Sequence, residues 1–254
     1  MLVRLGQIPE LPKTLSPDAL AYVDGIISNF SLADAQRVKE IEKVTNHDVK
    51  SVEYLLKEKF ASHPELHGIS EWLHFACTSE DISNLSYSLM LKEARETIVL
   101  PAIDDLIARV RSLAHKFATV PMLSRTHGQT ATPTTVGKEL ANFAFRLGRQ
   151  RQQYAAVAVM GKINGAVGNF NAHMIAYPNI DWENASQQFI ERDLKLTYNA
   201  YTTQIEPHDY IAESFDALAR FNTVLLDMDR DMWGTLRTVW FDCATSLGCV
   251  LFLK

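Results

Sequence analysis

The sequence predicts an all-α fold, on two observations. Apolar residues recur at helical spacing through residues 79–117 and again in later segments, which is typical of long amphipathic helices. Alternating strand patterns bounded by turn residues are scarce, so we expect β structure only in short pieces. We therefore expect a small N-terminal helical domain (1–78), part of a long-helix bundle (79–234) and a tail (235–254).

Helix-capping residues predict short helices in the N-terminal domain. Ser16 precedes Pro17 and Asp18, a pattern in which a serine caps a helix and proline occupies its first turn. This helix is expected to end near residue 30, where Ser31 caps a second one. A third is expected to follow residues 46–48 and to run to about residue 60.

Prolines divide the rest of the chain into long helices. Pro101 interrupts the helical pattern that ends near Phe117, and we expect a kink there because proline lacks the backbone N–H and clashes with the preceding turn. Pro133 and Pro207 are each expected to open a further long helix, since proline suits the first helical turn. Long amphipathic helices of this kind indicate a bundle.

Composition excludes several classes of protein. The net charge is −5 and basic residues form no long run, so nucleic acid is not an expected partner. The three cysteines form no CxxC pair, which argues against a disulfide framework and favours a reducing cytoplasm. No segment approaches the ~20 apolar residues of a membrane helix, nor does the start resemble a signal peptide. We expect a soluble, cytoplasmic protein.

Two polar, glycine-bearing segments, residues 124–133 and 161–169, are not explained by helical periodicity. Loops held between rigid helices are where binding and catalytic groups tend to lie. In the first, His127 is a candidate general acid or base, because the pKa of imidazole lies near neutrality. The alternative is a solvated loop histidine. Glycines of the second segment match no nucleotide-binding fingerprint and are expected to permit tight turns and close helix approach.

The predicted start of the long helix carries hydroxyl groups. Thr78 and Ser79 stand where free backbone N–H groups and the helix dipole favour a carboxylate or a phosphate. An ordinary helix cap is the alternative reading of the same two residues.

Histidines also cluster in the sequence. His63, His67 and His74 would lie near one face of a continuous helix, but Pro64 interrupts it. Neither an HExxH motif nor a cysteine partner supports a zinc centre, so no metal site is expected.

Five motifs are specific when taken together. They are TNHDVK at 45–50, HFACTSED at 74–81, THGQ at 126–129, GKINGAVGN at 161–169 and TTQIEPHDY at 202–210. Their order and spacing, over about residues 20–234, resemble the adenylosuccinate lyase family of the fumarase and aspartase superfamily. The resemblance implies the helical bundle of that superfamily.

The resemblance also implies a reaction. A base removes a proton beside a carboxylate of the succinyl group, the carbanion is stabilised as an aci-carboxylate, and an acid protonates the leaving nitrogen. The substrates implied are adenylosuccinate, which yields fumarate and AMP, and the succinylated imidazole-carboxamide ribonucleotide of purine biosynthesis. No cofactor is implied. Family members are homotetramers whose active sites draw on three subunits.

Matching positions assign roles to individual residues. His127 matches the general acid and His74 a catalytic histidine near the substrate, while Glu206 is expected to orient His127. Thr78 and Ser79 match residues that hold the succinyl carboxylates. The residues assigned to substrate binding are His47, Asp48, Thr78, Ser79, Gln129, Lys162, Asn164 and Gln204.

The chain departs from the family pattern at both ends. An Arg-Tyr pair that contacts the nucleotide phosphate should precede Met1, and a GSSxMPxKxNP loop that supplies the serine base should follow the last long helix. The tail 235–254, with Cys243 and Cys249, does not align to the family pattern. We expect a truncated chain with impaired activity. The alternatives are a non-catalytic helical oligomerising fragment, or another superfamily lyase such as argininosuccinate lyase, against which NHDVK and TTQIEPHDY argue.

Overall fold

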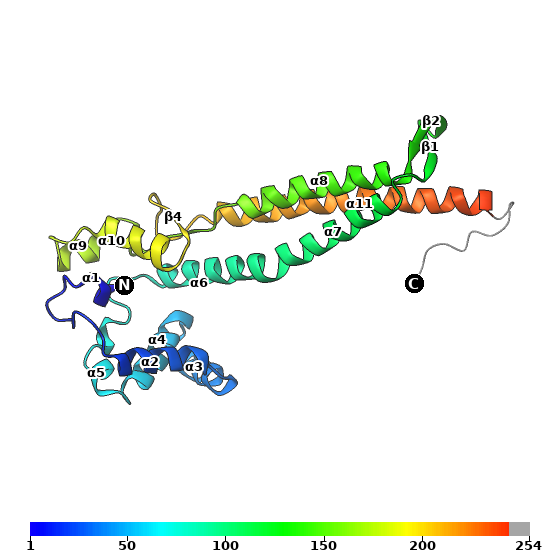
Figure 1. Ribbon diagram of the computed structural model, residues 1–254. Helices are drawn as coiled ribbons and strands as arrows, with labels where there is room; N and C mark the ends of the chain where they lie inside the picture. The colour runs from blue at the N-terminus through cyan, green and yellow to red at the C-terminus, as the bar shows by residue number, and fades with distance from the viewer. Residues whose placement is uncertain (244–254) are drawn as a thin grey trace. The chain divides into compact units, whose positions relative to one another are not determined.

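A computed structural model describes residues 1–243, without the side chains of Arg4 and of residues 236–243 (Figure 1). Helices dominate, so the all-α prediction is confirmed. The chain forms two compact units. Unit 1 contains residues 1–92 and 158–208, and unit 2 contains residues 93–157 and the chain from residue 209 onward. The predicted boundary near residue 78 stays a prediction, and most of the tail 235–254, including Cys249, lies outside the described residues.

The first stretch of unit 1 is a series of short helices, two of which have the caps expected from the sequence. Ser16 Oγ accepts the N–H of Ala19, and Ser31 forms a reciprocal capping box with Asp34. The elements are α1 (Leu2–Leu5), α2 (Pro17–Ser28), α3 (Leu32–Thr45), α4 (Asp48–Phe60), α5 (Pro64–His67) and η1 (Ser70–Trp72). The three predicted N-terminal helices are confirmed as α2, α3 and α4.

The second part of unit 1 joins the start of a long helix to a later stretch of chain. Its elements are α6 (Ser79–Ala94), β3 (Met160–Gly161), α9 (Asn171–Ala176), α10 (Trp182–Gln188), η3 (Phe189–Asp193) and β4 (Thr197–Tyr198). Strands β3 and β4 pair in parallel. A Cβ on Gly161 would lie 2.6 Å from Leu85 Cδ2, so this glycine permits β3 to approach α6. The predicted close approach at this glycine is thus confirmed.

Unit 2 is built from long helices. Its elements are η2 (Arg95–Val99), α7 (Leu100–Lys116), β1 (Pro121–Thr126), β2 (Gln129–Thr135), α8 (Val136–Ala156) and α11 (Asp209–Cys243). Helix α8 packs against both α7 and α11, and the three run alongside one another in Figure 1. Their shared core includes Ile107 of α7, Leu147 of α8 and Phe221 of α11, all buried. The predicted long-helix bundle is confirmed.

Two of the long helices begin later than predicted. Pro133 lies in β2, where it pairs with Leu123, and α8 begins at Val136 after Thr135 caps it. Residues 121–135 form an antiparallel hairpin because the β-branched threonines of this segment favour extended backbone. Helix α11 begins at Asp209, two residues after the predicted start at Pro207.

A kink was predicted at Pro101, and the structure has a π-helical turn just before this residue. Residues 95–99 adopt π-helical geometry, and the N–H of Leu100 bonds to the carbonyl of Arg95. Pro101 follows within α7 and has no N–H to offer to Thr97, so the wider turn accommodates the missing donor. Within the described residues, no helix is long and apolar enough to cross a membrane.

Candidate functional site

Two of the five motifs meet at the start of α6. Ser79 is the first residue of this helix, and its Oγ lies 3.1 Å from Nε2 of His47, the residue that caps α4. The N–H of Thr78 donates to Asp81 Oδ2 at 2.9 Å, which fixes the backbone just before the helix. The structure therefore brings four of the predicted substrate-binding residues, those of the TNHDVK and HFACTSED motifs, to one place in unit 1.

The hydrogen bonds of His47 favour one tautomer. Its Nδ1 accepts the N–H of Lys50 at 3.3 Å, so in the neutral ring the proton is on Nε2. Nε2 then donates to Ser79 Oγ, which leaves the serine hydroxyl hydrogen available for an anion. Asp48 Oδ1 lies 3.3 Å from Nδ1 and would pair with a protonated ring. The pair can thus present a hydroxyl donor to a carboxylate.

His74 lies in the same segment as Thr78 and is half-buried. Its pKa is lowered, chiefly because burial disfavours the imidazolium, and the neighbouring Lys50 acts in the same direction. The ring is therefore neutral near pH 7 and can exchange a proton with a bound group. Burial raises the pKa of the Cys77 thiol to about 12, so this cysteine is not a nucleophile.

A buried ionic network connects α6 to the segment 161–169. Asp81 and Lys162 are both fully buried, and Lys162 Nζ lies 2.8 Å from Asp81 Oδ1. The backbone N–H groups of Asn164 and Gly165 also donate to the Asp81 carboxylate, at 3.2 and 3.1 Å. Lys162 Nζ donates further to the carbonyl of Gly165 at 3.1 Å. The GKINGAVGN motif is therefore held against the HFACTSED motif.

The network already engages two residues assigned to substrate binding. Lys162 is paired with Asp81, and Asn164 Nδ2 donates to Thr202 Oγ1 at 2.8 Å. Asn164 Oδ1 is buried and has no hydrogen-bond partner within the described residues. Contact of Lys162 and Asn164 with substrate stays a prediction.

The TTQIEPHDY motif packs on the same region. Gly168 has a φ of +79°, and a Cβ there would collide with the carbonyl of Thr202, so only glycine fits at this crossing. Thr202 is also the partner of Asn164, while Gln204 is exposed. The loop that carries Gln204 is therefore fixed against residues 164–168, although the Gln204 side chain is open to solvent.

Glu206 faces a histidine that the sequence did not single out. It is almost fully buried, and its Oε2 accepts the N–H of His208 at 2.6 Å and lies 3.4 Å from His208 Nδ1. On its other side, His208 Nε2 lies 3.3 Å from Glu80 Oε1. The expected pairing of Glu206 with His127 stays a prediction. A motif match does not show which side chains contact one another. The only signal in the sequence for a role of His208 was its position within the TTQIEPHDY motif.

His127 occupies the tip of the hairpin in unit 2. His127 and Gly128, with φ of +51° and +73°, form a two-residue turn between β1 and β2, and Gln129 begins β2. Both His127 and Gln129 are exposed. Because the other predicted site residues, apart from Gln129, belong to unit 1, their union with His127 in one site stays a prediction.

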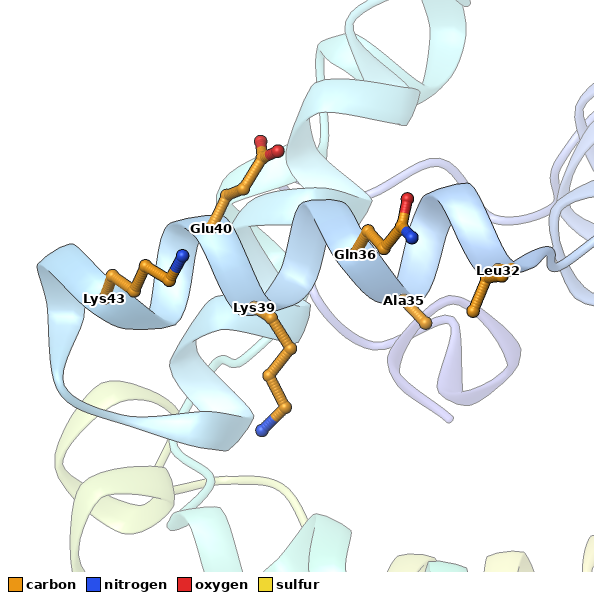
Figure 2. Close-up of a pocket in the computed structure, with 6 residues that line it drawn as sticks. All are labelled: Leu32, Ala35, Gln36, Lys39, Glu40 and Lys43. Carbon is orange, nitrogen blue, oxygen red and sulfur yellow. The ribbon is translucent and has the colours of Figure 1, made fainter.

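Two surface hollows in the described part of the chain lie away from the motifs. One lies on α3, and Figure 2 shows that its side chains point to different sides of the helix and do not converge. A second, apolar hollow in unit 2 is lined by residues such as Leu140, Met228 and Trp233. Over the described part of the chain, no group of three or more His, Cys, Asp or Glu residues could hold a metal ion. His63 caps α5 and contacts Asp18 Oδ2 at 3.1 Å.

Comparisons with known proteins agree with the motifs. A family model described as "Lyase" matches residues 3–241. Adenylosuccinate lyase of Vibrio cholerae is 56% identical over 97% of this chain and 54% of its own length. The Escherichia coli adenylosuccinate lyase is 56% identical over 95% of the chain and 52% of its length, and that of Haemophilus influenzae is 54% identical. The chain thus spans about half the length of these relatives.

A solved structure has a similar fold. The 3-carboxy-cis,cis-muconate lactonizing enzyme of Pseudomonas putida superimposes with a TM-score of 0.64 at 20% identity. The similarity covers 86% of this chain and 48% of the solved one. At this identity the likeness concerns the fold alone.

Proposed function

The chain belongs to the lyase family of the fumarase and aspartase superfamily, and from this premise we propose that it supplies part of the active site of an adenylosuccinate lyase. The proposed reaction releases fumarate from adenylosuccinate and leaves AMP. The succinylated imidazole-carboxamide ribonucleotide of purine biosynthesis is the proposed second substrate. The identity to adenylosuccinate lyases of three bacteria supports this activity over that of other lyases.

The single observation that carries the proposal is the contact between Ser79 and His47 at the start of α6. It places a hydroxyl donor beside an imidazole, with the helix N-terminus behind them. Because the helix dipole and free N–H groups favour negative charge, this place suits a carboxylate of the succinyl group. We propose that Thr78 and Ser79 bind that carboxylate.

The remaining roles follow the family pattern. His127 is proposed as the acid that protonates the leaving nitrogen, and neutral His74 as a group that exchanges a proton near the substrate. His47 and Asp48 are proposed to lie near the nucleotide. The residues proposed to complete substrate binding are Gln129, Lys162, Asn164 and Gln204. No cofactor takes part in this scheme.

We also propose a homotetramer in the cytoplasm, in which neighbouring subunits complete each active site. The exposed position of His127 at a hairpin tip is compatible with a role in a site shared between subunits. Light scattering of the purified protein measures the assembly. A monomer at micromolar concentration would contradict this part of the proposal.

A chimaera tests the proposed activity. Residues 1–234 of this chain are joined to the remaining half of the E. coli relative, and fumarate release is followed with adenylosuccinate and with argininosuccinate. We expect turnover of adenylosuccinate alone. Release of fumarate from argininosuccinate would favour the other lyase, and no turnover of either substrate by a folded tetramer would favour a non-catalytic helical fragment.

A further inference from the structure

The Asp81 carboxylate is placed differently from that of an ordinary helix-capping residue. It stands in the first turn of α6 and accepts the N–H of Thr78, as a capping carboxylate does. It is also fully buried and accepts two N–H groups from another segment of the chain, those of Asn164 and Gly165. Capping alone requires only the first of these contacts, so the carboxylate serves to join two segments.

The backbone just before Thr78 is strained. Ala76 has a φ of +56°, a conformation that residues with a Cβ rarely adopt. Gly165 lies directly against it, since a Cβ on Gly165 would be 3.4 Å from the carbonyl of Ala76. A strained residue persists only where its surroundings determine its conformation. Here the surroundings of Ala76 include Gly165, whose segment is hydrogen-bonded to Asp81.

We propose that Asp81 is a positioning residue. Its carboxylate accepts hydrogen bonds from three backbone N–H groups and in this way holds Thr78 and Ser79 in place for the substrate carboxylate. The inference rests on the proposed function, which assigns the carboxylate to these two residues. Asp81 is buried and so acts through the backbone and not by contact with substrate.

Lys162 has a separate task. Its ammonium group is fully buried beside Asp81 and balances the carboxylate charge, but it makes no hydrogen bond to residues 76–79 within the described structure. Removing one member of a buried ion pair destabilises a protein strongly, whereas removing both charges is often tolerated. Substitution can therefore separate the charge balance that Lys162 provides from the positioning that Asp81 provides.

The test uses the full 254-residue chain and three variants, Asp81→Asn, Lys162→Met and the double variant. Amide hydrogen exchange of residues 76–79 is measured without ligand, together with thermal unfolding and the Kd for adenylosuccinate. We expect Lys162→Met to keep the Thr78 amide protected, since the carboxylate retains its three N–H donors. The double variant should exchange this amide at least about tenfold faster and bind adenylosuccinate about tenfold more weakly than Lys162→Met.

The comparison of Lys162→Met with the double variant decides the question even where Asp81→Asn alone does not fold, because the two differ only at residue 81. Where Lys162→Met does not fold either, the double variant, which leaves no unpaired buried charge, is compared with the wild-type chain. Equal exchange of the Thr78 amide in both would overturn the proposal. Ser186→Ala is the matched control: it removes a buried hydrogen bond to the carbonyl of Ile163 in the same segment and should leave the Thr78 amide protected. If the wild-type chain alone binds no adenylosuccinate, the Kd comparison is made in the chimaera of residues 1–234, whose failure to bind would contradict the proposed function, while the exchange rates would still decide the role of Asp81.

Discussion

At the scale of single residues, motifs identified the groups of the candidate site but not the contacts that hold them. His47, Thr78 and Ser79 come from two separate motifs, and the structure places them together at α6. Asp81 and His208 were not singled out, and their partners Lys162 and Glu80 lie far away in the sequence. Neither helical periodicity nor residue type predicts a contact between residues so far apart in the sequence.

His173 is another residue that the sequence did not single out. It is fully buried, and its ring lies 4.8 Å from that of Trp182 and 5.5 Å from that of Phe170. Burial lowers its pKa, and the more distant Asp81 offsets this only in part. Neither ring nitrogen has a hydrogen-bond partner within the described residues. The native state therefore favours neutral His173.

This gives a prediction on pH and stability. A histidine with a lowered pKa in the folded state binds more protons when unfolded, so the free energy of unfolding falls as pH drops below the unfolded pKa of about 6.5. His173→Phe should reduce this loss between about pH 7.5 and pH 5.5. Part of the loss should remain, since the pKa of His74 is lowered as well. Urea denaturation at the two pH values measures the effect.

The control for this experiment is His67→Phe at an exposed position, which should keep the pH dependence of the wild-type chain. Each variant is compared with itself at the two pH values, so a change in packing at residue 173 does not affect the conclusion. A His173→Phe chain with the full pH dependence would show that this histidine is not kept neutral by the fold.

At the scale of elements, local signals predicted the helices and missed the hairpin and the π-helical turn. Ser16 and Ser31 cap the helices that were expected to begin there, because capping is a contact between near neighbours in sequence. The hairpin at 121–135 is a short extended pair next to a helix-compatible proline, and periodicity over so few residues is ambiguous. The π-helical turn depends on the missing donor of Pro101, which the sequence indicated only as an irregularity.

The capping box of α3 offers a test at this scale. Ser31 Oγ accepts the N–H of Asp34, and Asp34 Oδ2 accepts the N–H of Ser31 at 2.9 Å. Ser31→Ala should lower the free energy of unfolding by about 1 kcal/mol, because a helix N–H loses its partner. Ser28→Ala is the matched control, since its exposed hydroxyl only donates to the Asp24 carbonyl of its own helix. Equal losses in both would contradict the role of the cap.

At the scale of the whole molecule, the sequence predicted a helical chain with a long-helix bundle but not how the units are composed. Each unit is assembled from two separate stretches of chain, and periodicity carries no information on which stretches pair. The family resemblance, by contrast, was available from the motifs and is confirmed by the comparisons. Five short motifs in register identify a family well before any packing is known.

The central claim is that residues of this chain carry out the proposed elimination. The most direct test is the kcat and KM for fumarate release by the chimaera of residues 1–234, with His127 intact and as His127→Ala. Positioned acid catalysis contributes about 10² to 10⁴ in rate, whereas one hydrogen bond contributes about 1 kcal/mol to affinity. We therefore predict a fall in kcat of about 10² or more with little change in KM. Near-normal turnover by the His127→Ala chimaera would contradict the account.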